Sequence, residues 1–267
     1  MKKTVTALAA CAIALTAGAQ TPKAVNQNPF LAPYTTPYEI PPFEQIKVSD
    51  YIPALKAGIE QHNKEIAAIA NSKAEPTFEN VILAMDRAGD ILEKVVYVYG
   101  ALSESNSSPE LQAVADTFEP MLAAHQDEVS MNPALFKRVK ALYDKRDKLN
   151  LATDQKRLLE KYYKDFVRNG ALLNDKEQAE LKAINADLSN LYIKFNRNLL
   201  AATNAFEIVV DDVKDLAGLP ESNIAVAADE AKARGKEGKY VLTLHAPSRL
   251  PVLQYADNRD IRRKMWQ

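Results

Sequence analysis

The side chains best suited to chemistry in this sequence are its three histidines, His62, His125 and His245. His62 and His125 are each followed three residues later by a glutamate, Glu65 and Glu128. On a helix this spacing places both side chains on one face, from which they could contribute to a metal site in a helical bundle. The spacing is common in charged helices, however, and a catalytic zinc takes three protein ligands. We therefore predict that neither pair binds a metal.

The remaining candidates favour structural roles. His245 lies at the end of a predicted strand, in LHAP (residues 244–247), where we expect it to make a structural hydrogen bond. The serines of SESNSSPE (residues 103–110) are not part of a Gly-x-Ser-x-Gly turn, and the sequence has no phosphate-binding loop. Asp211 and Asp212 follow a predicted strand, where Asp commonly caps a turn. We assign no catalytic, cofactor-binding or metal-binding residue from these patterns.

The elements that carry these side chains are predicted to be helices. From residue 49 onward, apolar residues recur at helical spacing, so the predicted fold class is mainly α: a multi-helix array with a small β element near residues 206–244. Helix starts are indicated at Ser49, Thr77, Ser108 before Pro109, Asn132 before Pro133, Thr153, and Asn174 with Glu177. Gly170 is the predicted end of the helix that starts at Thr153.

The helix after Asn174 has the most regular apolar pattern. Its seam, at spacings of three and four residues, consists of Leu181, Ile184, Leu188, Leu191, Phe195, Asn198 and Ala202. Such a seam is typical of a coiled coil, so one interpretation is a surface for a partner helix. Soluble helical domains use the same spacing internally, and we predict that the seam is buried within the chain's own bundle.

The sequence after this helix changes character. The runs FEIVV (206–210) and YVLTL (240–244) are rich in β-branched and aromatic residues and predict two strands, with a helix over 222–234 between them. Asn258 is a good N-cap for a last helix, on which Ile261, Met265 and Trp266 are expected to share one face. No stop signal follows that helix, so we expect the chain to be truncated.

Composition and the N-terminus set the class of protein. The 267 residues are 47% hydrophobic and carry a net charge of −1, which indicates a globular protein and gives no support to nucleic-acid binding. Residues 1–19 read as a signal peptide, with two lysines, an apolar stretch and an A-x-A site, so we expect export to the periplasm. The alternative is a lipoprotein modified at Cys11, the only cysteine. We expect no transmembrane segment in the mature protein.

Residues 20–48 form a proline-rich arm. Proline fixes φ and disfavours helix before it, so an extended segment is predicted. Its aromatic residues, Phe30, Tyr34, Tyr38 and Phe43, are expected to dock on the body, because aromatic side chains are depleted in disordered segments.

Collinear strings from residue 28 onward resemble a known family: NPFLAPYTTPYEIPPFEQI, DYIPALKAGI, PTFENVI, LAAHQDE, LFKRVKALYDKRDKLNL, FVRNGALL, LKAINADLSNLYIKFNRNLL, VVDDVKDLAGLP, GKYVLTLHAPSRLPVLQYADNR and IRRKMW. They are similar to the N-terminal region of bacterial peptidyl-dipeptidases in the M3 family of zinc metallopeptidases, which includes thimet oligopeptidase and oligopeptidase A. DLAGLP and the YADNR run favour the peptidyl-dipeptidase branch.

The resemblance implies a mostly helical two-part ellipsoid with a deep channel, into which peptides enter and from which C-terminal dipeptides are released. In this family an HExxH helix in the C-terminal half and a downstream Glu hold the zinc. None of His62, His125 and His245 is followed by Glu, so HExxH is absent and no catalytic residue is carried over. Residues 49–267 are then the N-terminal helical region, truncated before the catalytic zinc domain.

Three hypotheses follow. In the first, the chain is the non-catalytic portion of an exported zinc peptidyl-dipeptidase and forms one wall of its substrate channel. Alone it is expected to bind no zinc and to be inactive, and the intact enzyme is expected to be monomeric and to act on peptides. In the second, the chain is a stand-alone helical peptide-binding module. In the third, it is half of a split metallopeptidase with a separately encoded catalytic partner.

Overall fold

The computed structural model describes residues 28–267, and it is mainly helical with one pair of short strands, as predicted. The signal peptide and the first residues of the arm lie outside the described residues. The first body contains α1 (Tyr51–Ala70), α2 (Ala84–Asp86), α3 (Asp90–Ser105), α4 (Pro109–Ser130), α5 (Pro133–Asp144) and α6 (Thr153–Arg168). The rest comprises α7 (Asp175–Ala205), β1 (Ile208–Val210), α8 (Glu221–Ala233), β2 (Tyr240–Leu242), α9 (Ala246–Tyr255) and α10 (Arg259–Trp266).

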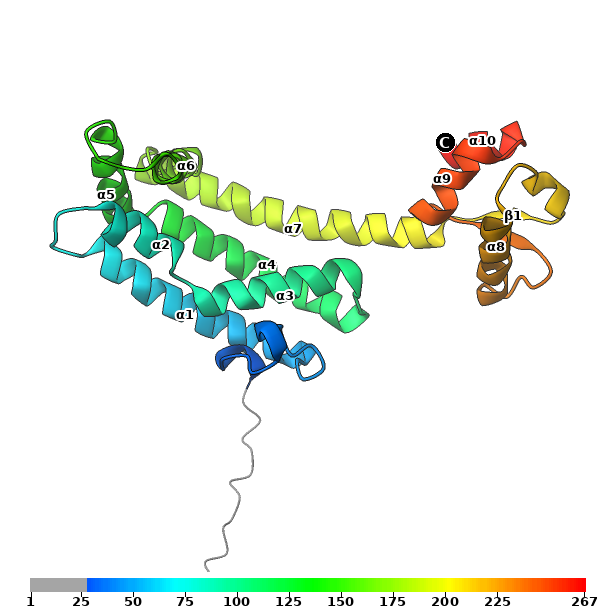
Figure 1. Ribbon diagram of the computed structural model, residues 1–267, viewed down its shortest axis with the longest axis horizontal. Coiled ribbons are helices and arrows are strands. Elements are labelled where there is room, and N and C mark those ends of the chain that lie inside the picture. Colours follow the sequence, from blue (N-terminus) through cyan, green and yellow to red (C-terminus); the bar gives the residue numbers. More distant parts are fainter. Residues whose placement is uncertain (1–27) are drawn as a thin grey trace, which may run out of the picture.

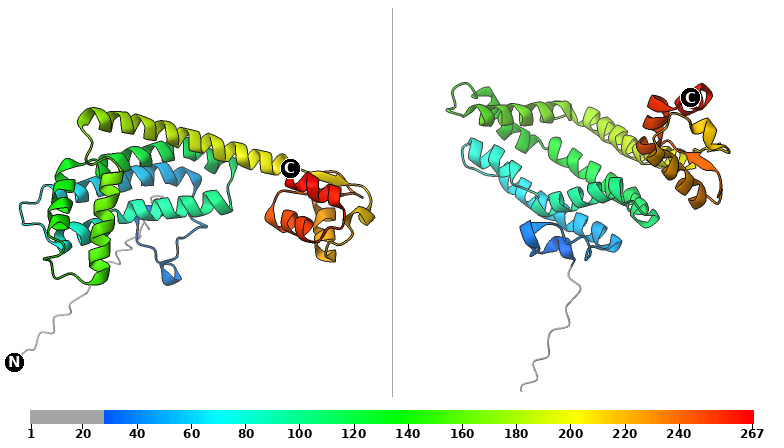
Figure 2. Two further views of the ribbon diagram at one scale, coloured as in Figure 1. Left: turned by 90° about the horizontal axis from the view of Figure 1, so that it is seen from above. Right: turned by 45° about the vertical axis from the view of Figure 1, so that its right-hand side comes forward.

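The long helix α7 joins two separate bodies. It starts beside α6, runs along α4, and then continues to a small unit made of β1, β2 and α8 to α10 (Figures 1 and 2). In that unit the two strands pair antiparallel, with Val209 opposite Val241. The predicted strands are confirmed, although each is shorter than the apolar run that contains it.

Buried apolar side chains of the described residues form three clusters. One joins the second half of α1 to α5, α6 and the π-helical segment Phe78–Leu83. A second joins the first half of α1 to α3 and α4, and it includes Phe30 of the arm. The third is the core of the small unit. The first body therefore has two apolar cores, both of which include residues of α1, and the small unit has one.

The predicted helix caps are mostly confirmed. Asn174 and Glu177 form a capping box, in which each side chain accepts a hydrogen bond from the other's backbone N–H at 3.0 Å. Thr77, Ser108, Asn132 and Asn258 also cap their helices. Two starts were wrong. Ser49 lies in a 3₁₀ turn that precedes α1, and Thr153 is already inside α6, where Gln155 reaches back to the N–H of Ala152.

Two contacts fix the relative positions of the first helices. Gly58 of α1 lies directly against Leu92 of α3, so close that a Cβ atom at Gly58 would be 2.8 Å from the Leu92 Cα. The buried guanidinium of Arg138, on α5, donates to the carbonyl oxygens of Ser72 and Ala74 at 2.9 and 3.0 Å and so holds the loop after α1. These contacts position α1 and α3, which carry part of the groove described below.

The prediction that the seam of α7 is buried within the bundle is wrong. Ile184, Leu188, Leu191 and Phe195 are 48, 56, 59 and 63% exposed. The reason is the rotation of the helix: α7 turns towards α4 the strip on its opposite side, which includes Ile193, and that strip matches small and polar residues on α4. The seam is left facing away from α4.

The proline-rich arm is docked only in part. Phe30 is buried, with its ring centroid 5.3 Å from that of Tyr51 and the two rings tilted at 51°, and Tyr34 lies beneath the ammonium of Lys94. Tyr38 and Phe43, in contrast, are 95 and 44% exposed, so their predicted docking is wrong. The segment is also less extended than predicted, because 3₁₀ turns interrupt it at Pro29–Leu31 and Pro37–Glu39.

The last helix, α10, contributes to the core of the small unit through only two of the three predicted side chains. Ile261 and Met265 are buried, but Trp266 is 81% exposed. Positions 261 and 265 are one turn apart and face the core together, whereas position 266 is rotated a further 100° or so around the helix axis. Trp266 therefore lies outside the apolar cluster.

Candidate functional site

A groove of about 1050 Å³ lies in the first body. Its lining comes from α1, α2, α3 and α4, and on the other side from α6 and α7. Residues of six helices therefore meet at one place, although they are up to 130 positions apart in the sequence, from His62 to Tyr192. A groove built in this way is the usual form of a ligand site between packed helices.

Two of the predicted histidines meet in this groove. The Nδ1 atom of His62, on α1, lies 2.8 Å from the Nε2 atom of His125, on α4, so one ring donates a hydrogen bond to the other. The rings are edge to face, with centroids 4.9 Å apart. The second ring nitrogen of His125, Nδ1, is buried and has no hydrogen-bond partner among the described residues. The sequence alone gave no sign that these two residues, 63 positions apart, would be in contact.

The surroundings keep both rings neutral near pH 7. Burial, reinforced by the neighbouring His62, lowers the pKa of His125 to about 4. Burial also lowers the pKa of His62, and the nearby carboxylate of Glu65 opposes this only in part. Two adjacent imidazoles can share one hydrogen bond as neutral rings. Protonation of both rings, in contrast, would place two N–H donors against each other. The pair is thus a neutral link between α1 and α4.

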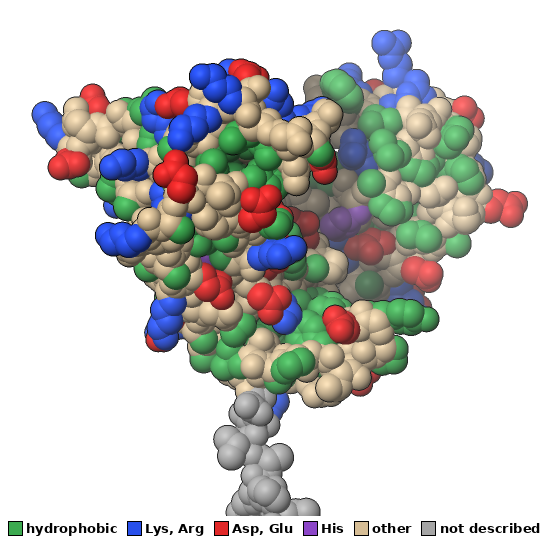
Figure 3. Space-filling model, turned by 60° about the vertical axis from the view of Figure 1, so that its left-hand side comes forward, with side chains coloured by type: hydrophobic (Ala, Val, Ile, Leu, Met, Phe, Trp, Pro, Cys, Tyr) green, Lys and Arg blue, Asp and Glu red, His purple; other side chains and the backbone are tan. Residues whose placement is uncertain are grey.

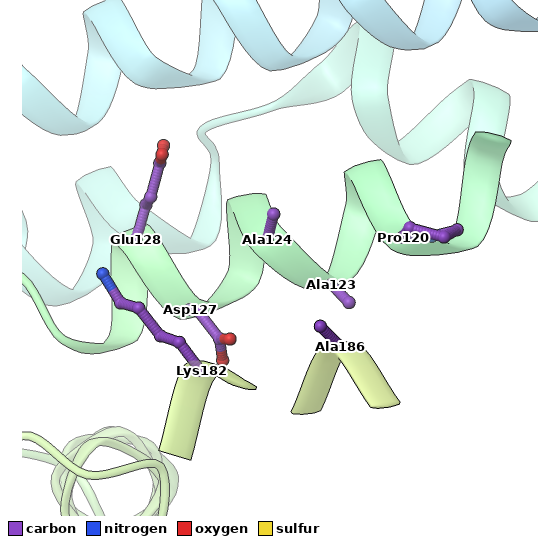
Figure 4. Close-up of a pocket in the computed structure, with 7 residues that line it drawn as sticks. All are labelled: Pro120, Ala123, Ala124, Asp127, Glu128, Lys182 and Ala186. Atoms are coloured by element: carbon purple, nitrogen blue, oxygen red, sulfur yellow. The ribbon is translucent and has the colours of Figure 1, made fainter. Parts of the chain in front are cut away.

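The glutamates that accompany the histidines do not complete a metal site. Glu65 accepts hydrogen bonds from the backbone N–H of Gly89, at 2.7 Å, and from the side chain of Gln61. Glu128 is exposed, and its side chain points away from α7 (Figure 4). Nowhere in residues 28–267 do three His, Cys, Asp or Glu side chains converge as metal ligands would. The donor set at the histidine pair therefore does not fit a catalytic zinc, which needs three.

The other residues considered from the sequence have structural roles. Asp212 caps a 3₁₀ turn by accepting from the N–H of Lys214, and Asp211 pairs with Lys239 at 2.7 Å. His245 is exposed, and it is its backbone carbonyl that accepts hydrogen bonds, from the N–H groups of Ser248 and Arg249. The expected structural contact of His245 thus comes from its backbone rather than from its ring.

Small residues let α7 approach α4 beside the groove. Ala123 of α4 and Ala186 of α7 face each other across the contact (Figure 4). Next to them, Asp127 points from α4 towards α7 and accepts a hydrogen bond from the side chain of Asn185 at 2.7 Å. Asp127 is only 9% exposed, so this bond matters for the position of α7. Further along, Arg197 binds Asp116 at 3.0 Å and completes the attachment.

The exposed seam of α7 passes the rim of the groove at Leu188. Leu188 belongs to the seam and also lines the groove, together with its neighbour Tyr192, which is 66% exposed. Beyond them the seam continues through Leu191 and Phe195. An apolar stretch that continues over several turns of a helix is larger than the scattered apolar residues normal on a soluble surface, and such patches mark interaction sites.

Charged side chains elsewhere on the molecule are mixed. On the face shown in Figure 3, lysines and arginines alternate with aspartates and glutamates and form no patch of one sign. This distribution agrees with the net charge of −1. Within residues 28–267 no helix is both long and apolar enough to cross a membrane.

Comparison with known proteins gives consistent matches. The family model for the Neurolysin/Thimet oligopeptidase N-terminal domain matches residues 55–178. A dipeptidyl carboxypeptidase of Escherichia coli (strain K12) is 36% identical over 241 residues, which cover 90% of this chain and 35% of that protein. The dipeptidyl carboxypeptidase of Salmonella typhimurium (strain LT2) is 35% identical over 242 residues, covering 91% of this chain and 36% of that protein.

A second group of relatives is more distant. Oligopeptidase A of Escherichia coli (strain K12) is 31% identical over 235 residues, covering 88% of this chain and 34% of that protein. The chain therefore spans about a third of the length of the curated relatives it matches.

Proposed function

The chain corresponds to the N-terminal region of the M3 peptidases, with that family's N-terminal domain at residues 55–178, and on this premise we propose that it is the non-catalytic portion of an exported zinc peptidyl-dipeptidase. The observation that carries the proposal is the match to dipeptidyl carboxypeptidases over 90% of this chain but about a third of their length. The intact enzyme would remove dipeptides from the C-terminus of peptides.

The geometry supports a role for this portion in forming a channel wall. The groove in the first body is open on one side, and the apolar seam of α7 borders it. A soluble protein gains free energy when such a surface is covered, at roughly 25 cal/mol for each Å² of apolar area removed from water. We infer that the rest of the enzyme packs against the seam and that the groove then faces the substrate.

The zinc would be held outside this chain. None of the three histidines is followed by Glu. His62 and His125 are hydrogen-bonded to each other, and within residues 28–267 no third metal ligand lies beside them. When bound in the intact enzyme, the metal would activate the water that attacks the peptide bond. The part of this chain would be to bind and orient the peptide, and by itself it would cleave nothing.

Reading the DNA downstream of the codon for Gln267 tests the proposal directly. We expect an open frame that continues the chain and encodes an HExxH motif. Expression of that longer product should yield chelator-sensitive release of dipeptides, whereas the 267-residue chain should release none. A stop codon directly after Gln267, with no such frame nearby, would refute the proposal, and so would dipeptide release by the 267-residue chain alone.

Two alternatives lead to different results in the same experiment. A stop codon with a separate gene for an HExxH protein nearby would indicate half of a split metallopeptidase. A stop codon without such a gene would indicate a stand-alone peptide-binding module, which the groove would suit. Export is a separate proposal that rests on residues 1–19. Mass spectrometry of the mature protein should show an N-terminus after Ala19, and a lipid-modified Cys11 or an intact Met1 would contradict it.

A further inference from the structure

The groove has an unusual balance of charge. Among the residues that line it are five carboxylates and no lysine or arginine: Asp86, Glu93, Glu119, Asp127 and Asp165. They come from α2, α3, α4 and α6, so the fold gathers them from four helices. The molecule as a whole is nearly neutral, and this hollow is therefore a local exception.

Not all of these carboxylates have a positively charged partner within the described part of the chain. Asp165 is paired with Lys161 at 2.6 Å, Asp127 accepts from Asn185, and Asp86 accepts from the hydroxyl of Tyr162 at 3.3 Å. Glu93 lies beside the hydroxyl of Tyr97, one helical turn on, and neither Glu93 nor Glu119 makes an ion pair within residues 28–267. Glu119 is half-buried, and a half-buried carboxylate without a cation is costly unless a ligand supplies one.

Two further features indicate a ligand that is more than a cation. His125 lines the groove and is 97% buried, since only 3% of it is exposed, and its Nδ1 atom lacks a hydrogen-bond partner among the described residues. Because this atom is buried as well as unpaired, the ring is an unsatisfied polar group in the wall of the groove. At the rim, Tyr97, Leu188 and Tyr192 are 68, 56 and 66% exposed and offer apolar contact area.

We propose that the groove binds an extended peptide segment in which Lys or Arg residues alternate with apolar residues. The carboxylates of Glu93 and Glu119 receive the cations, and the rim formed by Tyr97, Leu188 and Tyr192 contacts the apolar side chains. Opposite charges in a groove of this kind favour both binding and the rate of encounter. The inference rests on the proposed function in one respect: it names the class of peptide that this wall of the enzyme would select.

Calorimetric titration of the 267-residue chain tests the inference without any catalysis. The probes are a synthetic peptide of alternating Lys and Leu, and its counterpart in which every Lys is Glu. We expect the Lys peptide to bind, with an affinity that falls as salt is raised, because exposed charges are screened. The Glu peptide should not bind. The variant in which Glu93→Gln and Glu119→Gln are combined should bind the Lys peptide about fivefold more weakly, as the loss of two partly exposed charge pairs implies.

The matched control combines Glu104→Gln and Asp229→Asn, which remove the same two charges from exposed positions on α3 and α8 outside the groove. This control should bind the Lys peptide as the parent does. The inference is overturned if neither peptide binds, if the Glu peptide binds as well as the Lys peptide, or if the control loses as much affinity as the groove variant. Peptide binding without dipeptide release by the extended protein would contradict the proposed function and leave the groove assignment standing.

Discussion

Replacing Gly58 by Ala should destabilise the first body, whereas the same replacement at Gly100 should stabilise it. Both glycines lie inside helices, in α1 and α3, where Ala has a helix propensity about 1 kcal/mol more favourable. At Gly100 no atom of residues 28–267 would lie within 4 Å of an added Cβ, so this gain of about 1 kcal/mol is expected in full.

At Gly58 the added methyl group would meet the backbone of α3. Its Cβ would be 2.8 Å from both the Cα and the N atom of Leu92, and backbone atoms cannot rotate away as a side chain can. Overpacking of this kind costs about 1–3 kcal/mol, and contact with backbone places it near the upper value. Subtracting the propensity gain leaves a net cost of about 2 kcal/mol, so the two variants should differ by about 3 kcal/mol.

The assay is urea unfolding followed by far-ultraviolet circular dichroism, with the parent, Gly58→Ala and Gly100→Ala measured side by side. Helical signal is suitable because the first body contains most of the helices. The reasoning is refuted if Gly58→Ala is as stable as the parent or more so. It is also refuted if Gly100→Ala loses stability, since that would mean that close packing does not distinguish the two positions.

Three other changes give further tests. His125→Gln should reduce the loss of stability on acidification. The folded-state pKa of His125 is about 4 and its unfolded value about 6.5, so its contribution is complete above pH 6.5 and is lost as the pH falls towards 4, by about 3 kcal/mol. The exposed His245→Gln should leave the pH profile of unfolding unchanged. Arg138→Met should cost about 2–4 kcal/mol in denaturant unfolding, because two carbonyl oxygens lose their donor, while the exposed Arg168→Met should change stability by less than about 0.5 kcal/mol. The exposed apolar seam of α7 should make the 267-residue chain self-associate in sedimentation experiments, and Leu191→Glu should reduce that association; unchanged association would contradict a role for the seam.

Local patterns predicted the elements well because their causes are local. A capping box such as that of Asn174 and Glu177 depends on residues only three positions apart, and the two strands were indicated by β-branched runs. The two wrong starts, at Ser49 and Thr153, arose where a short 3₁₀ turn or a glutamine side chain took over the expected role.

The orientation of α7 and the composition of the groove could not be predicted in the same way. The seam through Leu188 and Leu191 has the spacing of a buried face, and only the small surface of α4 around Ala123 decides that another strip is buried instead. Similarly, the contact between His62 and His125 depends on how α1 and α4 cross, which no short-range pattern records. Glu93 and Glu119 look like ordinary solvent-exposed residues of charged helices until the fold brings them to one hollow.

The last hydrogen bonds that hold α7 to α4 are those of Arg197, and eight further residues lead from there to Ala205 and the small unit. At 1.5 Å per residue this last part of the helix measures about 12 Å. Because a helix resists bending, a change in its tilt at Arg197 is passed on to the small unit at its end. A tilt of about 10° at that point would carry the start of the small unit through about 2 Å. Any partner that grips the seam on both sides of Arg197 would therefore set the orientation of the small unit as well as its own position.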